Sequence, residues 1–244
     1  MRRISLNCDL GESFGVYQTG NDQAIIPLVD EINVACGFHA GDAHTMNQTI
    51  RLAKQHHVEV GAHPGLPDIQ GFGRRRMQVT AQEVYDWTVY QIGALKAFTE
   101  IQHVKLHHIK PHGALYNMAC QDQQLALAIA QAVFDLDPSL RLVGLSGSEL
   151  IHAGSTVGLA VVNEVFADRR YHNNGRLVAR GTPGSLLHDT ESVIQQVRQM
   201  LDNGTVMTQE GNEIPIIADT ICVHGDNTAA LELVKQIRTI LTSR

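Results

Sequence analysis

The sequence predicts an α/β fold, a (β/α) barrel of about seven parallel strands formed by one domain, residues 1–244. Three observations lead to this prediction. Short β-type runs alternate with helical patterns along the chain, which is typical of a parallel sheet covered by helices. Each run has one apolar face and one polar or small face. The runs end in His, Asp, Asn or Gly, as strands do where an active site lies at their carboxyl ends.

The expected elements follow one another in a regular order. The strands are expected at residues 4–9, 32–39, 58–63, 108–113, 141–145, 160–164 and 220–224. The helices are expected at 42–56, 80–100, 122–135, 189–202 and 228–241. Thr80 and Glu83 form a capping box at the start of one helix, and Gly204 follows the end of another. No repeat, low-complexity tract or linker interrupts this alternation, so one domain is expected.

The polar residues of the strands favour a closed barrel over an open doubly wound sheet. Side chains alternate between the two faces of a strand, so Asn7 and Asp9 share one face. By the same alternation, Lys110 and His112 lie on one face of their run. A polar face on nearly every strand suits a barrel whose lumen is polar near its carboxyl-terminal mouth.

Two loops are longer than a connection between strand and helix needs, and both are rich in arginine. They cover residues 64–79 and 165–188, and together they hold seven of the nineteen Lys and Arg residues of an acidic chain. Loops of this length without their own secondary structure are usually functional or disordered. A concentrated cationic rim indicates an anionic substrate or a phosphate, and solvated surface arginines are the alternative.

Composition excludes several classes of function. The net charge of −6 argues against nucleic acid or an anionic membrane surface as the main partner. No apolar run reaches the roughly 18 residues of a membrane span, and the amino terminus shows no apolar signal region. The four cysteines lack metal-type or redox-type spacing, which favours buried reduced thiols and a cytoplasmic protein.

The residues at the expected strand ends and in the long loops are the candidates for chemistry. The Gly-rich phosphate-loop, dinucleotide and HExxH motifs are absent from the sequence. Acid, base or charge-stabilising roles are expected for Asp9, His39, His63, Lys110, His112, Glu164, His224 and Asp226. Substrate-binding roles are expected for Asn7, Asp42, Arg74, Arg75, Asn117, Arg169 and Arg180.

Several of these candidates have a structural alternative. Asp42 also suits the N-cap of the next helix, and Lys110 also suits a partner for a strand-end carboxylate. Glu164 could anchor an arginine of the second long loop rather than act in catalysis. Asp9, His39 and His63 could bind a divalent ion, or they could form an acid/base cluster without metal. The second reading is favoured, because no spacing demands a metal.

Seven motifs make the chain resemble the lactam-utilisation (LamB/YcsF) family over nearly its whole length. They are NCDLGE at 7–12, ACGFHAGD at 35–42, GAHPG at 61–65, GFGRR at 71–75, KPHGALYN at 110–117, EVFADR at 164–169 and CVHGDN at 222–227. They occur in the family's order. Ala43 departs from the proline that the family often has there, and a helix start tolerates this change.

The resemblance implies a distorted seven-stranded (β/α) barrel similar to glycoside hydrolases and polysaccharide deacetylases. The characterised members of the family are the A subunits of ATP-dependent 5-oxoprolinase. The resemblance therefore implies cleavage of 5-oxo-L-proline to L-glutamate coupled to ATP hydrolysis, with two companion subunits, B and C. The subunit that binds ATP stays open. A stand-alone metal-dependent amidase or deacetylase, and a non-catalytic subunit that presents substrate, are the alternatives.

The implied chemistry gives hypothetical roles to individual residues. Asp9 or Asp226 would orient water as a base, and His63 or His112 would pass a proton to the ring nitrogen. Lys110 would offset developing negative charge. An arginine of the long loops would hold the substrate carboxylate or the phosphate; the candidates are Arg74, Arg75 and Arg169.

Overall fold

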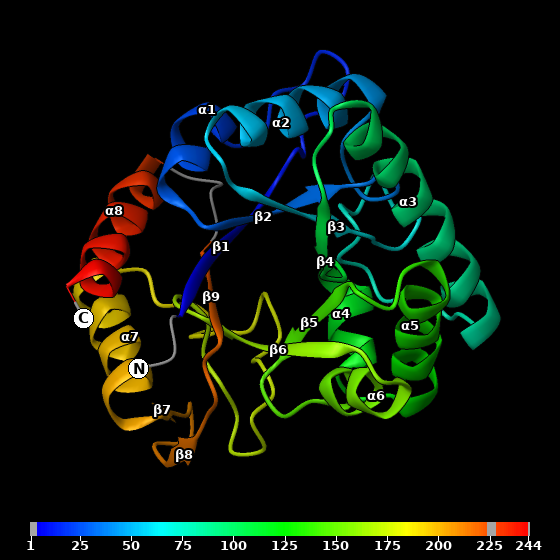
Figure 1. Cartoon of the computed structure of the whole chain (residues 1–244). Coiled ribbons are helices and arrows are strands. Elements are labelled where there is room, and N and C mark those ends of the chain that lie inside the picture. Colours follow the sequence, from blue (N-terminus) through cyan, green and yellow to red (C-terminus); the bar gives the residue numbers. More distant parts are fainter. Residues whose placement is uncertain (1–3, 224–227, 244) are drawn as a thin grey trace.

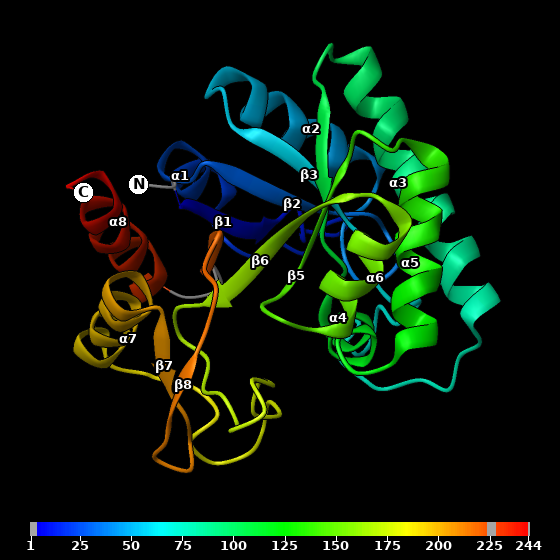
Figure 2. The ribbon, with the colours of Figure 1, turned by 60° about the horizontal axis from the view of Figure 1, so that its bottom comes forward.

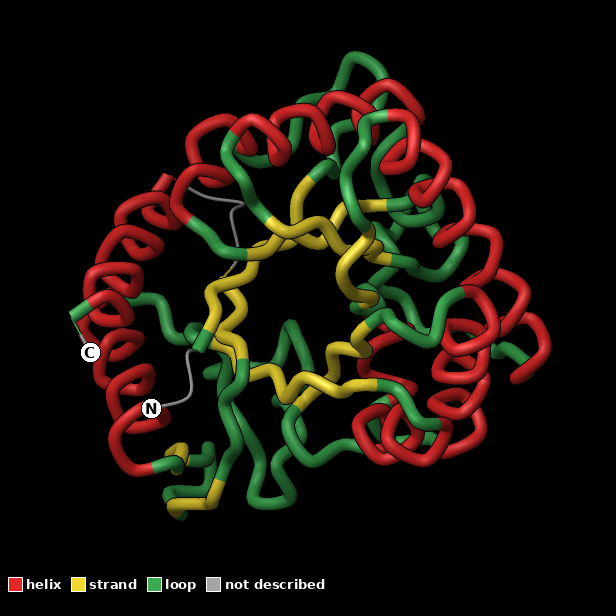
Figure 3. Tube along the Cα trace, viewed as in Figure 1, coloured by secondary structure: helices red, strands yellow, loops and turns green. Residues whose placement is uncertain are grey.

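Parallel strands close into a barrel at the centre of the molecule (Figures 1 and 3). The computed structural model describes residues 4–223 and 228–243. Within these residues the barrel strands are β1 (Ser5–Leu10), β2 (Glu31–Ala35), β3 (Glu59–His63), β4 (Leu106–Ile109), β5 (Arg141–Leu145), β6 (Ala160–Phe166) and β9 (Thr220–Val223). Neighbours follow the chain order, and β9 pairs with both β6 and β1 to close the ring. The predicted seven-stranded (β/α) barrel is thus confirmed, and the open sheet is excluded.

Helices surround the barrel and bury its outer face (Figure 3). They are α1 (Asp22–Ile25), α2 (Ala43–Gln55), α3 (Ala81–Ile101), α4 (Gly113–Ala119), α5 (Gln123–Leu136), α6 (Glu149–Val157), α7 (Thr190–Asn203) and α8 (Thr228–Thr242), with a short 3-10 turn at Ile26–Leu28. The capping box of Thr80 and Glu83 starts α3, and Gly204 ends α7 in the left-handed conformation, both as predicted. The core lies between the two layers, where strand residues such as Leu6, Ile32 and Val60 are fully buried.

The inner face of the barrel is polar, as the alternation of side chains predicted. Asn33 donates from Nδ2 to Oδ1 of Asn7 and to Oδ1 of Asp9, both at 2.8 Å. Nε2 of His108 lies 2.7 Å from Oδ1 of Asn33. Polar groups removed from water need such partners. The lumen is therefore a hydrogen-bonded network that supports the strand ends above it.

Two predicted strands are shorter than expected, and their last residues lie in loops. β2 ends at Ala35 rather than at residue 39, because Gly37 takes a φ of +89° that extended backbone does not have. β4 ends at Ile109 rather than at residue 113, because Pro111 has no N–H for the ladder and Gly113 begins α4. The last predicted residue of the final strand, His224, lies outside the described residues.

Some elements were not predicted. They are α1, α4, α6 and an antiparallel pair, β7 (Thr205–Met207) with β8 (Glu213–Pro215). Figure 2 shows this pair, coloured orange, beside the long yellow-green loop that follows β6. A bridge between Tyr171 and Thr208 joins the loop to the pair. Within residues 4–223 and 228–243, no helix combines the length and apolarity that crossing a membrane requires.

Candidate active site

A cavity of about 710 Å³ opens at the carboxyl ends of the strands. Residues of both long loops line it, as expected if their arginines form one cationic rim. Eight predicted site residues line it: Asp9, His63, Arg74, Lys110, His112, Asn117, Arg169 and Arg180. The cavity is also lined by Glu12, Phe72, Tyr116 and Arg176. Charged groups of both signs therefore face one small volume.

Lys110 is the centre of a buried charge network at the base of the cavity. Its side chain is only 2% exposed, and Nζ lies 2.9 Å from Oδ1 of Asp9 and 2.7 Å from Oε1 of Glu164. Nζ also donates to Oδ1 of Asn7 and approaches Sγ of Cys222, both at 3.2 Å. Burial alone would lower the pKa of Lys110, but the charge of Asp9, with further contributions from Cys222 and Glu164, raises it well above its ordinary value. Lys110 is therefore a fixed ammonium ion.

Glu164 belongs to this network rather than to the arginines of the long loop. Oε1 accepts from Nδ2 of Asn7 at 3.1 Å, and Oε2 accepts from the hydroxyl of Tyr116 at 2.7 Å. The side chain is fully buried. Within the described residues, Glu164 therefore pairs with Lys110 rather than with Arg169 or Arg180, the structural alternative suggested from the sequence. Lys110, which follows β4 and lies inside the lumen, contacts this carboxylate instead.

His63 and His112 form a pair that is bounded by a backbone carbonyl at each end. Nδ1 of His63 lies 2.7 Å from the Lys110 carbonyl, and Nε2 of His112 lies 2.8 Å from the Phe72 carbonyl. Their inner nitrogens, Nε2 of His63 and Nδ1 of His112, are 2.9 Å apart. A carbonyl only accepts, so each outer nitrogen must carry a proton. The inner nitrogens then share one further proton, or else both present lone pairs to the same point.

His39 stacks on His112 with the ring centroids 3.6 Å apart and the planes 4° from parallel. It is 1% exposed, and neither ring nitrogen has a hydrogen-bond partner within the described part of the chain. Burial, followed by the neighbouring His112 and His63, lowers the pKa of His39 well below its ordinary value. Oε1 of Glu12 lies 3.8 Å from its Nε2. As a neutral imidazole, this ring therefore offers, among the described residues, one uncommitted lone pair and one unpaired N–H beside the histidine pair.

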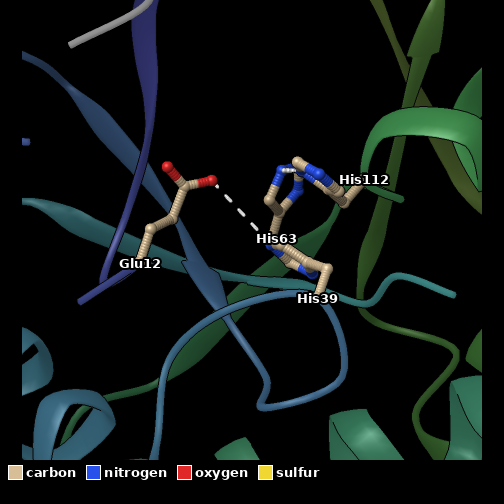
Figure 4. A group of neighbouring side chains, drawn as sticks. All are labelled: Glu12, His39, His63 and His112. Carbon is tan, nitrogen blue, oxygen red and sulfur yellow. Dashed lines mark hydrogen bonds and ion pairs between the residues drawn. The ribbon is translucent and has the colours of Figure 1, made fainter. Parts of the chain in front are cut away.

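Glu12, His39, His63 and His112 form the group that could hold a metal ion (Figure 4). One nitrogen or oxygen from each lies within 4.8 Å of all the others. Three of the four side chains are buried imidazoles, and the carboxylate is half-buried. The metal-binding alternative suggested from the sequence named Asp9, His39 and His63. The structure places Glu12 and His112 in the group in addition to the two predicted histidines.

The loop at residues 71–74 folds across the histidines because of its glycines. Gly73 has a φ of +63°, and a Cβ built on it would lie 2.6 Å from Cβ of His39 and 2.9 Å from Cδ2 of His112. Only glycine fits so close an approach. Phe72, at a φ of +54°, points its carbonyl at His112. The loop is then tied down where the amide of Ala114 donates to the Gly73 carbonyl at 2.9 Å.

Arginines form the outer wall of the cavity. Arg74 and Arg76 come from the first long loop, and Arg169, Arg176 and Arg180 come from the second. Arg169 is 4% exposed; Nη2 donates to the Val178 carbonyl at 2.7 Å, while Nε has no hydrogen-bond partner among the described residues. Burial and the charge of Arg180 lower the pKa of Arg169 to about 10, so it remains cationic at neutral pH. This wall suits an anionic ligand.

Other predicted residues lie away from the cavity surface. Asp42 caps α2 by accepting from the Thr45 amide, as the structural alternative held, and its other oxygen accepts from Gly15. Arg75 is 64% exposed and pairs with Asp68 outside the cavity. Asn7, His39 and Glu164 are buried behind the cavity wall. His224 and Asp226 fall outside the described residues.

Sequence reasoning missed four residues of the site: Glu12, Phe72, Tyr116 and Arg176. Glu12 follows Asp9 at a strand end, and Tyr116 lies in the dense motif that holds Lys110 and His112. Their position in those motifs could have marked both residues as members of the site. Phe72 acts through its backbone carbonyl, which side-chain identity does not reveal. Arg176 was among the seven loop arginines without being singled out.

Comparison with known proteins agrees with the fold and the motifs. The family model described as "LamB/YcsF family" matches residues 4–244. The 5-oxoprolinase A subunit of Staphylococcus carnosus (strain TM300) is 55% identical over 240 residues, covering 98% of this chain and 95% of that protein. The protein of the same name from Staphylococcus aureus (strain bovine RF122 / ET3-1) is 53% identical over 239 residues, covering 98% of this chain and 96% of that one.

A solved structure shares the whole architecture. The crystal structure of the lactam utilization protein from Thermus thermophilus superposes with a TM-score of 0.92 at 44% sequence identity. The match covers 99% of this chain and 96% of that one. The barrel, its motifs at the strand ends and these full-length matches give one conclusion: the chain belongs to the LamB/YcsF family.

Proposed function

We propose that this chain is the A subunit of an ATP-dependent 5-oxoprolinase and that its cavity opens the lactam ring. The similarity to two proteins named as 5-oxoprolinase A subunits, across nearly the full length of each, supports the assignment. The observation that carries it is the joint placement of Asp9, Lys110 and the histidine pair at one cavity wall beneath an arginine rim. Because those relatives are named as subunits, companion chains are expected, which we take to be subunits B and C.

The compartment and the division of labour are part of the proposal. All four cysteines are buried and free, which fits a reducing compartment, so we place the enzyme in the cytoplasm. The sequence has no Gly-rich phosphate loop, so ATP is expected to bind mainly on one of the companion chains. This chain would then receive a lactam that has been activated by phosphorylation.

Ring opening needs activation because a lactam carbonyl is a poor electrophile. Transfer of the γ-phosphoryl group of ATP to the carbonyl oxygen makes the ring carbon open to attack by water. The carbon–nitrogen bond must then break, because loss of phosphate at this point would return the lactam. The ring nitrogen takes a proton as it leaves, and a second water converts the resulting acyl phosphate to glutamate and phosphate.

The geometry supports a role for each group at the wall. Asp9, whose Oδ1 lies 2.9 Å from Nζ of Lys110, takes the proton of the attacking water. The pair of His63 and His112 supplies the proton for the leaving nitrogen, and Oδ2 of Asp9 lies 3.4 Å from Nε2 of His63. The arginine rim binds the substrate carboxylate or the phosphoryl group. Glu164 positions Lys110 without facing the cavity.

The test is an assay of ATP-dependent glutamate formation from 5-oxoproline. We expect negligible turnover by this chain alone and robust turnover once its two companion subunits are added. Robust ATP-dependent turnover by the pure chain would refute the division of labour. A reconstituted complex that releases no glutamate would overturn the assignment itself.

A second candidate function is a metal-dependent amidase or deacetylase that acts alone. The group of Glu12, His39, His63 and His112 favours it, because three imidazoles and a carboxylate suit a catalytic ion. This reading requires hydrolysis of a cyclic or N-acetyl amide by the pure chain without ATP. Comparing the chain alone, with and without added metal, against the reconstituted complex distinguishes the two functions.

A further inference from the structure

We propose that His39, His63, His112 and Glu12 form a binding site for one divalent transition-metal ion, with Zn²⁺ as the best-suited probe. The site is defined by the side chains of this chain. It can be tested without substrate, ATP or companion subunits, so it stands or falls separately from the proposed function.

Hydrogen bonding fixes which nitrogens of the histidine pair are available. The Lys110 and Phe72 carbonyls accept from the outer nitrogens of His63 and His112 at 2.7 and 2.8 Å. In neutral rings this leaves lone pairs on the two inner nitrogens, which lie 2.9 Å apart. Metal-binding histidines usually donate their other ring N–H to a carbonyl or carboxylate. Both members of the pair have such a partner already in place.

Within the described residues, the unpartnered ring of His39 is a separate reason to expect an ion at this point. Its ring is buried, and neither nitrogen has a hydrogen-bond partner among the described residues. A buried polar group normally has a partner. Room for the ring is kept by a glycine, since a Cβ at Gly65 would lie 2.6 Å from Nδ1 of His39. A metal ion would satisfy Nε2 of His39, which faces Glu12 at 3.8 Å, together with both inner nitrogens of the pair.

The dimensions of the group are close to those of a tetrahedral site. Bonds of about 2.0–2.1 Å place tetrahedral ligand atoms about 3.4 Å apart. The four atoms here lie within 4.8 Å of one another, so the widest separation must shrink by up to about 1.4 Å, while the inner nitrogens of His63 and His112, 2.9 Å apart, must separate by about 0.5 Å. The two ligands expected to move are Glu12, whose side chain is 14% exposed, and His39, which has no hydrogen bond to break within the described part of the chain.

The chemistry of the ligands selects the class of ion. Imidazole ligands suit zinc and its first-row neighbours, while calcium and magnesium prefer oxygen. Glu12, His63 and His112 line the cavity, so a bound ion faces the space where a substrate would lie. With all four protein ligands in place the ion would have no open position; it would polarise a bound water or substrate only by expanding to five-coordination or by releasing the half-buried Glu12. A bound ion would occupy the inner nitrogens of His63 and His112, so the metal-loaded pair would not supply the proton that the proposed function assigns to it.

The first experiment measures stoichiometry and affinity on the full-length protein. The chain is stripped with a chelator, titrated with Zn²⁺, desalted and analysed for metal. We expect about one ion per chain in the wild type. His39→Ala and His63→Ala should weaken binding by more than about 100-fold, since even changes to second-layer partners cost about 10- to 100-fold. His152→Ala, on the exposed side of α6, is the matched control and should bind as the wild type does.

A second measurement protects the test against variants that fail to fold. Glu12→Gln changes a half-buried side chain and should preserve the circular dichroism spectrum while weakening Zn²⁺ at least about 10-fold. Co²⁺ bound to the wild type should show the intense visible absorption of four-coordinate cobalt. Absence of a stoichiometric ion would overturn the site and favour a shared proton between His63 and His112. Equal Zn²⁺ affinity in the wild type, Glu12→Gln and His39→Ala would overturn it as well.

Discussion

Asp9 and His63 face each other at the cavity wall, with Oδ2 of Asp9 3.4 Å from Nε2 of His63. The other oxygen of the same carboxylate accepts from Lys110 at 2.9 Å. One carboxylate therefore joins the buried charge network to the histidine pair. Since β1, β3 and the loop after β4 supply the three residues, barrel closure is what brings them together.

Asp9→Asn should abolish most ring opening while leaving the chain folded. The amide keeps the shape of the side chain but cannot take a proton from water. General acid–base groups contribute a factor of about 100 to 10,000, so glutamate formation by the reconstituted complex should fall by at least about 100-fold. Asp86→Asn, at an exposed position of α3, is the control. Near-normal glutamate production by Asp9→Asn would remove Asp9 from the mechanism.

Glu164→Gln should destabilise the protein more than Tyr116→Phe. Loss of one partner from a buried ion pair costs about 3 to 5 kcal/mol, and among the described residues Lys110 keeps only Asp9 as a full charge partner in this variant. Tyr116→Phe removes a single hydrogen bond to the carboxylate, which is worth about 1.5 to 3 kcal/mol. Urea unfolding of both variants gives the order. A Glu164→Gln variant as stable as the wild type would contradict the charge network.

Residues at strand ends could be predicted from the sequence, whereas residues placed by loop paths could not. Asp9 and His63 follow from strand alternation and from the rule that active sites lie at carboxyl ends. The position of His39 depends on a turn in which Gly37 and Gly41 take φ values of +89° and +77°. Sequence periodicity carries no information about such a turn, so the expected strand ran through it.

Asp42 and Arg75 were predicted to bind substrate, but neither side chain lines the cavity, because each is held by other partners. Asp42 is used by the amides of Thr45 and Gly15. Arg75 is used by Asp68 in the same loop. The contact of Lys110 with Glu164 is different, because it crosses the lumen between β4 and β6 and exists only when the barrel is closed. A single sequence shows which residues are polar, but it does not show which partner each will reach.

Gly73→Ala should displace the rings of His39 and His112, an effect that the strain of a positive φ alone would not produce. An alanine Cβ would lie 2.6 Å from Cβ of His39 and 2.9 Å from Cδ2 of His112, so the loop or the rings must shift. A displacement of about 1 Å in a catalytic site can cost about 100-fold in rate. Gly147→Ala is the matched control, because its φ is +68° and a Cβ there meets nothing within 4 Å.

Both glycine variants should lose stability in thermal unfolding, since both place alanine in the left-handed region, and Gly73→Ala should lose more because its Cβ also displaces the loop or the rings. A Cβ at a positive φ costs roughly 1 kcal/mol. Only Gly73→Ala should also lose glutamate formation in the reconstituted complex. Equal activity of the two variants would mean that the close approach of this loop has no part in the site.

Glu31 should make the stability of the fold depend on pH near neutrality. It lies at the amino-terminal end of β2, is 8% exposed, and burial raises its pKa from 4.5 to about 7, with Asp30 and Glu164 adding to the effect and Ser5 and Arg141 opposing it. A carboxyl whose pKa is higher in the folded state stabilises the fold while it is protonated. That contribution is complete below about pH 4.5 and is lost as the pH rises through about 7.

Glu31→Gln should therefore be more stable than the wild type at about pH 8.5, by up to about 3 kcal/mol, and should lose this advantage by about pH 5. The reason is that glutamine stays neutral where the buried glutamate must ionise. Urea unfolding of both proteins at the two pH values measures the difference. Glu59→Gln, at the exposed position that pairs with Glu31 on β3, is the control and should track the wild type at both values. A Glu31→Gln variant whose stability relative to the wild type does not change with pH would show that Glu31 is ionised at little cost in the folded protein.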